Sequence, residues 1–193
     1  DQYGADTMRL YEMFMGPLEV SKPWSSAGVE GAKRFIVRVW NFFTEPANLT
    51  DDNDGALTKI YHQTVKKVTD DFEALAFNTA ISQLMIFMNA AYKAGKCPKE
   101  YAEGIIKMMS CITPHVCEEM WQKLGHNDTI AYEPWPVYDE KELVVDTIEI
   151  AVQINGKVRG KINVGVDEDQ DSAIAKAKAN PDVAAAIEGK NIV

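Results

Sequence analysis

The sequence lacks the features of a membrane protein, a disulfide-rich protein or a hydrolase. No stretch approaches the roughly 18 consecutive apolar residues that a transmembrane helix needs, so we expect no membrane association. The 193 residues include only three cysteines, an odd number without paired spacing, which indicates a reduced, cytoplasmic compartment. Residues 1–6, DQYGAD, have neither a basic start nor an apolar block, so they are no signal peptide.

Sites for metals and for catalysis are also missing. Cys111, His115 and Cys117 are close in sequence, but Pro114 interrupts them and their spacing does not suit a closed zinc site with four ligands. The chain has no Gly-x-Ser-x-Gly elbow and no phosphate-binding loop. We therefore predict no metal site, no cofactor and no catalytic residue. A small hydrolase that uses Cys111 or His115 is a competing hypothesis with little in the sequence to favour it.

The composition is typical of an ordinary globular chain in which acidic residues outnumber basic ones. Hydrophobic residues make up 46% of it and charged residues 25%, and the formal net charge is −9. This balance argues against non-specific coating of DNA, but it leaves room for a local basic surface. The absence of an initiating Met leads us to expect a piece of a longer protein, which we take to be monomeric.

Apolar residues recur at helical spacing along most of the chain. Helices are predicted over residues 5–15, from 29 to about 43, from 57 to about 72, and from 77 to about 94. Between 51 and 55 the run DDNDG is expected to cap the helix that follows it. No strand is expected within 55–112.

A helical pattern over 99–124 contains Pro114. Proline lacks a backbone N–H and breaks a helix interior, but it suits the first helical position. We therefore predict a helix to Ile112, a break, and a second helix to Leu124 with Thr113 as its N-cap. Residues 126–142 are predicted to form a loop.

Near Thr147 the period of the pattern switches from 3.6 to two, which predicts a β-hairpin over 147–165 with its turn at Asn155-Gly156. We prefer a three-residue loop, 154–156, because it pairs Val152 with Val158. In this register Ile148 faces Ile162, Ile150 faces Gly160, and Glu149 faces Lys161. Short helices are then expected after the acidic run 167–169 and after Asn180-Pro181, the second ending at Gly189, with a strand beginning at 192–193.

Two groups of basic residues are candidates for RNA contact. Lys157, Arg159 and Lys161 stand at every second position of a segment that has no acid from 154 to 164, so the predicted register places them on one solvent-facing side, above Val152, Val158 and Ile162. Arg34 and Arg38 form a second polar stripe on the helix that begins near 29. Strands also carry basic residues for solubility alone, so each group has a structural alternative.

Several segments resemble bacterial-type, class I leucyl-tRNA synthetases. Residues 3–19 resemble the stretch just after the catalytic core of this family, and residues 21–25, 28–31, 34–35 and 39–40 resemble the same family. Residues 77–81 and 114–121 resemble the helical bundle shared with the isoleucyl, valyl and methionyl enzymes. Residues 152–160, VQINGKVRG, resemble the C-terminal module of the leucyl enzymes. The match covers nearly the whole chain in the expected order.

The resemblance implies a mainly α fold. Residues 1–28 would be a connector from the end of the catalytic region, 29–142 an antiparallel helical bundle of the anticodon-binding type, and 143–193 a small, truncated α+β module that binds tRNA. In this family the module is implied to reach the corner of the tRNA, which suits Lys157, Arg159 and Lys161. Arg34 and Arg38 could touch the backbone along the tRNA stem.

The resemblance also implies a ligase of protein biosynthesis that uses ATP, with magnesium, to attach leucine to its tRNA. The two ATP-handling signatures of the family and its editing insertion are absent from this sequence, so we expect leucine and ATP to bind to a catalytic domain outside it and the fragment itself to be inactive. The alternative from a different class is a helical protein-interaction module without RNA binding.

Overall fold

The computed structural model describes residues 2–143, 147–154, 156–165 and 169–187, which belong to two compact units. The first unit is Asp1–Leu143 and the second is Val144–Val193. The stretch 1–28, expected to be a connector, contributes its helix to the first unit.

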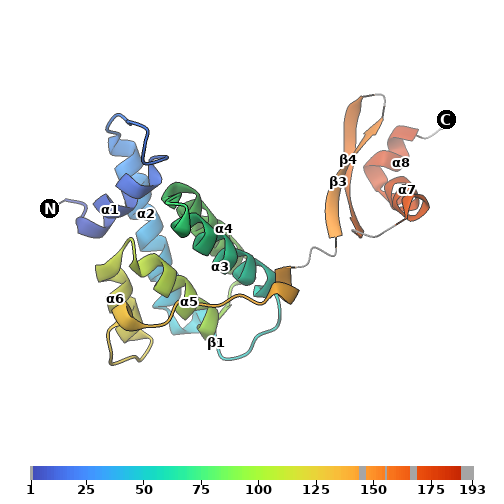
Figure 1. The fold of residues 1–193 in the computed structure, drawn as a ribbon. Coiled ribbons are helices and arrows are strands. Elements are labelled where there is room, and N and C mark those ends of the chain that lie inside the picture. The colour runs from blue at the N-terminus through green and yellow to red at the C-terminus, as the bar shows by residue number, and fades with distance from the viewer. Residues whose placement is uncertain (1, 144–146, 155, 166–168, 188–193) are drawn as a thin grey trace. The chain divides into compact units, whose positions relative to one another are not determined.

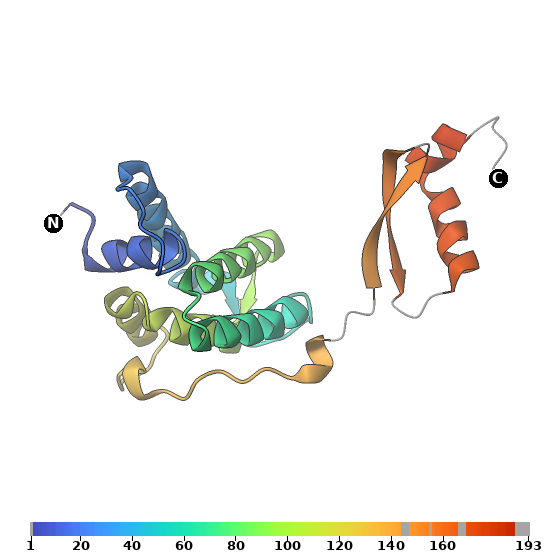
Figure 2. The ribbon, with the colours of Figure 1, turned by 45° about the horizontal axis from the view of Figure 1, so that its top comes forward.

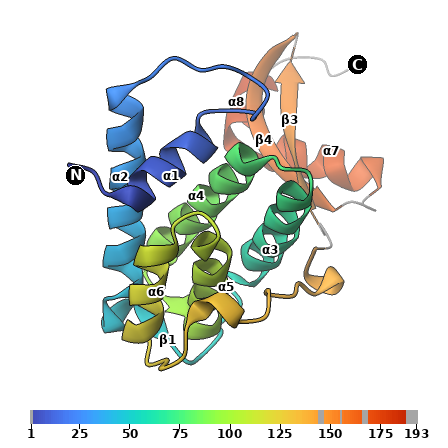
Figure 3. The same cartoon turned by 60° about the vertical axis from the view of Figure 1, so that its left-hand side comes forward.

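The described part of the first unit is built of helices joined by loops and short elements (Figure 1). The α-helices are α1 (Ala5–Phe14), α2 (Ser26–Phe43), α3 (Thr58–Glu73), α4 (Phe77–Ala94), α5 (Lys99–Ser110) and α6 (Pro114–Lys123). Short elements between and after them are η1 (Pro46–Asn48), β1 (Leu49–Thr50), β2 (Cys97–Pro98), η2 (Ile130–Tyr132) and η3 (Glu140–Leu143). α1 crosses α2 and also contacts α4 and α6 (Figure 3). The predicted mainly helical fold is confirmed.

One apolar core fills the first unit, because each long helix carries a stripe of large apolar side chains at spacings of three and four. The stripes come together in the centre, where the largest fully buried side chains include Trp121, Phe43, Phe87, Leu84 and Ile105. Each buried side chain of this size contributes about 1.5–3 kcal/mol relative to an exposed one. The core therefore fixes the positions of the helices.

The break at Pro114 is confirmed, but its cap differs from the prediction. The Thr113 hydroxyl donates back to the Met109 carbonyl (3.2 Å), and it makes no cap to α6. The buried carboxylate of Asp6 on α1 takes that role, because its Oδ2 accepts the Val116 N–H (2.7 Å) and its Oδ1 lies 2.7 Å from His115 Nδ1. A negative group at the N-terminus of α6 also suits the helix dipole.

The other end of the break is held from the same helix. Arg9, one turn after Asp6, donates from Nε to the Ile112 carbonyl (2.7 Å) and from a terminal guanidinium nitrogen to the Cys111 carbonyl (3.1 Å). At the C-terminal end of α5, the guanidinium satisfies carbonyls that have no partner within the helix, and its positive charge suits the helix dipole. Asp6 and Arg9 together form what we call the α1 clamp.

Three local predictions are wrong. The strands β1 and β2 form a two-residue parallel pair, Leu49 with Cys97 and Thr50 with Pro98, so a short strand does lie within 55–112. α2 begins at Ser26 and not near 29, because the Ser25 hydroxyl accepts the Gly28 N–H (3.1 Å).

The acidic run 51–55 does not cap α3, whose start has no side-chain cap. The side chains of this run instead stabilise the turn that leads into α3. Asn53 Oδ1 accepts the Gly55 N–H and Asp54 Oδ1 accepts the Ala56 N–H. Short polar side chains favour such bonds to backbone two residues on.

After α6, residues 126–143 run along the side of the helices (Figure 2). The Trp135 indole donates to the Thr69 hydroxyl (2.8 Å), and its ring lies 5.6 Å from that of Phe72. The Asp139 N–H donates to His62 Nδ1 (3.0 Å). These contacts fasten the segment to α3.

The second unit contains the strands β3 (Thr147–Ile154) and β4 (Lys157–Gly165) and the helices α7 (Gln170–Ala179) and α8 (Pro181–Ile187). Both predicted helices are present, and each begins with a side-chain cap, since Asp169 Oδ1 accepts the Ser172 N–H and Asn180 Oδ1 accepts the Asp182 N–H. The predicted helix end at Gly189, the strand at 192–193 and the caps at 167–168 lie outside the described residues. Among the helices that the structure describes, none has the length and hydropathy needed to cross a membrane.

The α1 clamp yields the first prediction. Asp6→Ala removes the acceptor of the partly buried Val116 N–H and should destabilise the first unit by about 1–3 kcal/mol. Glu12→Ala, at an exposed position of the same helix, should change the free energy of unfolding by less than about 0.5 kcal/mol. All four tryptophans lie in the first unit, so tryptophan fluorescence during urea unfolding measures both variants. Equal effects of the two substitutions would contradict the clamp.

Candidate nucleic-acid interface

Ile154 pairs with Lys157, so the predicted three-residue loop over 154–156 is wrong. Gly156 has a φ of +77°, a conformation that glycine adopts without steric cost. The irregularity lies inside β4 instead. Val158 pairs with Gln153 and Gly160 with Val152, which leaves Arg159 as the extra residue of a β-bulge.

The bulge places Lys157 and Lys161 on different faces of the hairpin. Their partners, Ile154 and Ala151, are three positions apart on β3 and therefore point to opposite faces. Directly paired residues of antiparallel strands share a face. The predicted one-sided stripe of Lys157, Arg159 and Lys161 is thus wrong, although all three side chains are exposed. The backbone partner of Glu149 is Asn163 and not Lys161.

The face that packs on the helices is set by Gly160 and Val164. Val164 is buried, and a side chain at Gly160 would lie 3.0 Å from atoms of Asn180 and Val183 at the start of α8. The Asn180 side-chain amide also donates to the Lys161 carbonyl (3.1 Å). Val152, Val158 and Ile162 were all predicted to lie on the buried side of the hairpin. Val152 and Ile162 are partly buried, whereas Val158 is 57% exposed and does not belong to the core.

On the first unit, the predicted pair on α2 divides into two environments. Arg34 is exposed. Arg38 is partly buried and tied to α4, because its guanidinium donates to Asn89 Oδ1 (2.6 Å) and lies 4.4 Å from the centre of the Tyr92 ring. The Tyr92 hydroxyl donates in return to the Arg38 carbonyl (2.8 Å).

These residues belong to a surface that is poor in acids. α2 has three basic residues and one acid, Glu30, and α4 has Lys93 and no acid. Within the described part of the chain, no carboxylate is close enough to Arg34, Arg38 or Lys93 to form an ion pair. We call Arg34, Arg38, Asn89 and Tyr92 the α2–α4 face, because Asn89 and Tyr92 join α4 to Arg38 and Arg34 lies one turn before Arg38 on α2.

Sequence reasoning missed the contribution of α4 to this face. Asn89 and Tyr92 look like ordinary members of a helix, and only the lack of any acid between 77 and 94 could have indicated a surface open to a polyanion.

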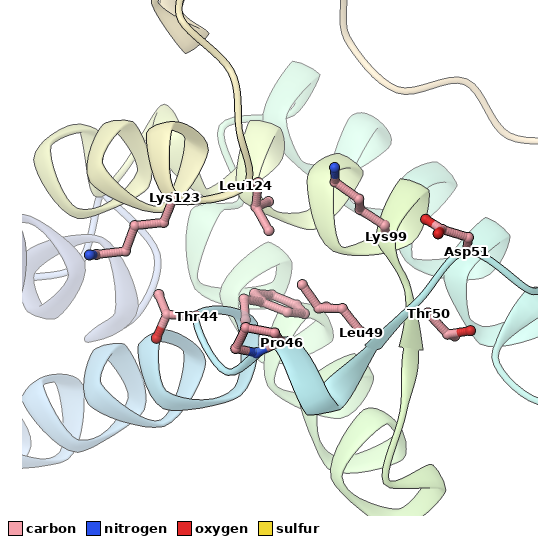
Figure 4. Close-up of a pocket in the computed structure, with 9 residues that line it drawn as sticks. Thr44, Pro46, Leu49, Thr50, Asp51, Lys99, Lys123 and Leu124 are labelled. Carbon is pink, nitrogen blue, oxygen red and sulfur yellow. The ribbon is translucent and has the colours of Figure 1, made fainter.

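A cavity of about 270 Å³ lies where α2 ends and α5 begins (Figure 4). Phe43, Leu49 and Leu124 give it apolar walls. Lys99 and Lys123 come from the helices on one side, and Pro46 and Leu49 come from the other. Lys123 is already close to an acid, with its ammonium 3.8 Å from Glu119. Asp51 also lines the cavity, so the two lysines do not make it a purely basic site.

The histidines and cysteines do not come together into a catalytic arrangement in the described residues. His115 pairs with Asp6, and His126 pairs with Glu103 (2.8 Å) while stacking on Trp121. Cys117 is buried, and its Sγ forms a hydrogen bond with the Thr113 hydroxyl. No group of three or more His, Cys, Asp or Glu side chains that could hold a metal is found in the part of the chain that the structure describes.

Burial divides the three thiols into two kinds. It raises the pKa of Cys97 and of Cys117 to about 12, whereas Cys111 is exposed and its pKa is raised less. Since the thiolate is the reactive form, Ellman's reagent at pH 8 should modify one thiol per folded chain and three after denaturation. Cys111→Ser should abolish the reaction of the folded chain. Rapid modification of two or three thiols would contradict the burial of Cys97 and Cys117.

The hairpin register yields a matched pair of substitutions. Val164→Thr places a hydroxyl in the core and should destabilise the second unit by about 1–3 kcal/mol. Val158→Thr makes the same change on an exposed side chain and should have an effect below about 0.5 kcal/mol. NMR resonances of β3 and β4 during thermal unfolding measure both. In a register with a three-residue loop, Val158→Thr would be the damaging change.

Similarity to known proteins agrees with an RNA-binding surface. A family model described as the anticodon-binding domain of tRNA ligase matches residues 54–175. Among solved structures, the chain is similar to the agnB2 LeuRS of Agrobacterium radiobacter K84, crystallised as a ternary complex with tRNA and LeuAMS, with a TM-score of 0.74 and 25% sequence identity. The match covers 100% of this chain and 27% of that one, so this chain spans about a quarter of the protein it resembles.

Proposed function

The chain belongs to the family of anticodon-binding domains of tRNA ligases, and we propose that it is the tRNA-holding part of a leucyl-tRNA synthetase. The observation that carries the proposal is the similarity of the whole chain to a LeuRS crystallised with tRNA. The family match alone gives a domain of an aminoacyl-tRNA synthetase. The amino acid, leucine, comes from the structural neighbour and from the sequence resemblance.

The chain corresponds to about a quarter of a LeuRS, so we propose that it binds tRNA while another part of the enzyme carries out catalysis. The parent protein would join leucine to its tRNA with ATP and magnesium in a catalytic domain outside these residues. Nothing in this sequence resembles a phosphate-binding loop. The fragment would hold tRNA without activating leucine, in a cytoplasmic and monomeric enzyme.

Charge placement explains how a chain of net charge −9 could hold a polyanion. Phosphates respond to the local field, which is set by nearby unpaired cations more than by the total charge. Arg34, Arg38 and Lys93 have no carboxylate partner among the described residues of the first unit. On the second unit, the side chains of Lys157, Arg159 and Lys161 are exposed. Because the bulge places Lys157 and Lys161 on opposite faces of the hairpin, we propose that these two residues contact different phosphates.

The alternative, a protein-interaction bundle, has no support from the family match or from the structural neighbour. It also makes a different prediction. Binding that releases counterions from phosphates weakens linearly on a log–log plot against salt, whereas a scaffold that does not bind RNA gives no such slope.

The test is the salt dependence of binding to a leucine tRNA transcript. Replacing Arg34 and Arg38 by Ala should weaken binding and reduce the slope by about 0.7–0.9 for each phosphate that is no longer neutralised. Lys66→Ala is the control, because its ammonium is already 2.6 Å from Asp70. Replacing Lys157, Arg159 and Lys161 by Ala should act in the same direction, with leucine activation by the parent enzyme unchanged.

If the wild-type chain shows no salt-dependent tRNA binding, the proposed function is wrong. If it binds and the arginine and hairpin variants behave like Lys66→Ala, the RNA lies on another surface.

A further inference from the structure

Arg38 is held in one place more firmly than an exposed arginine needs to be. Its guanidinium is tied to Asn89 at 2.6 Å and rests over the Tyr92 ring, and the Tyr92 hydroxyl is bonded to the Arg38 backbone. The Tyr92 ring is in turn supported by Phe42, whose ring centre is 4.7 Å away and which is 2% exposed. The guanidinium is thus the outer layer of a stack that starts in the core.

The hydrogen bond between Arg38 and Asn89 is informative because its acceptor, an amide oxygen, carries no charge. A residue that serves only to join α2 and α4 through an arginine would gain most from a carboxylate, since a carboxylate pairs with the guanidinium charge and can accept two parallel hydrogen bonds from it. Asn89 fixes the direction of the guanidinium with an amide oxygen and leaves its positive charge uncompensated. No carboxylate of the described residues is paired with Arg38.

One of the five N–H groups of the guanidinium is used by Asn89. No other hydrogen bond of this side chain is found among the described residues. The remaining N–H groups suit a ligand that accepts two parallel hydrogen bonds and carries negative charge, which describes a phosphate. Holding the side chain in advance removes much of the rotamer entropy that binding would otherwise cost.

We infer that Asn89 and Tyr92 are positioning residues, which hold the Arg38 guanidinium ready for one phosphate of the bound RNA. This inference rests on the proposed function and adds two residues that the sequence did not indicate.

Asn89→Asp separates positioning from a merely structural tie. The carboxylate keeps or strengthens the bond to Arg38, so the first unit should stay as stable as the wild type. It also neutralises the cation, so affinity for the leucine tRNA transcript should fall about tenfold, in line with the loss of one charged hydrogen bond. The log–log salt slope should fall by about 0.7–0.9.

Gln122→Glu is the matched control, since it makes the same amide-to-carboxylate change at an exposed position of α6. It should leave both affinity and slope close to those of the wild type. Arg38→Lys gives a second signature, because lysine keeps the charge but cannot form the planar fork. Its affinity should fall with the slope retained, whereas Arg38→Ala should reduce both.

The outcomes distinguish the positioning role from the proposed function. Wild-type binding with a steep salt slope, together with Asn89→Asp binding equal to that of Gln122→Glu, would overturn the positioning role and leave the proposed function standing. Absence of wild-type binding would overturn the proposed function itself. Urea unfolding followed by tryptophan fluorescence checks that each variant is folded.

Discussion

The first unit depends on the contact between α1 and the break that separates α5 from α6. Pro114 forces the chain to stop one helix and start another, which leaves the carbonyls of one end and the N–H groups of the other without partners. Asp6 and Arg9, one turn apart on α1, supply a carboxylate to the N–H side and a guanidinium to the carbonyl side. Because α1 also packs on α2 and α4, the same helix connects the break to the elements that carry the proposed RNA surface.

That surface depends on where acids are missing. The chain carries 29 acidic and 20 basic residues, yet α4 has no acid and α2 has one. Rigid helices keep the cations of α2 and α4 at fixed positions, and the stack of Arg38 on Tyr92 limits the motion of the one arginine of this face that is partly buried. The acidic remainder of the chain would discourage non-specific binding elsewhere, so the position of the RNA follows from local charge.

The sequence predicted the helices of the first unit, the break at Pro114 and the switch to strands near Thr147, because each depends on local periodicity or on proline. It could not predict the α1 clamp, since Asp6 and Val116 are 110 residues apart and nothing in either segment indicates the other. The hairpin shows a different limit. Alternation predicts a face only where it continues without interruption, and a bulge at Arg159 breaks it along β4, so Lys157 and Lys161 point to opposite faces. Asn89 and Tyr92 were missed because their role appears only when α2 and α4 are brought together.

The central claim is that RNA is held on the α2–α4 face of the first unit and on the hairpin of the second. NMR signals of the isotope-labelled chain, recorded during titration with a leucine tRNA transcript, test it most directly. The account predicts that Arg34, Arg38, Asn89 and Tyr92 lose intensity first, together with residues 157–161, and that added salt restores them. Changes confined to α6 and residues 126–143, with Arg38 unaffected, would contradict it.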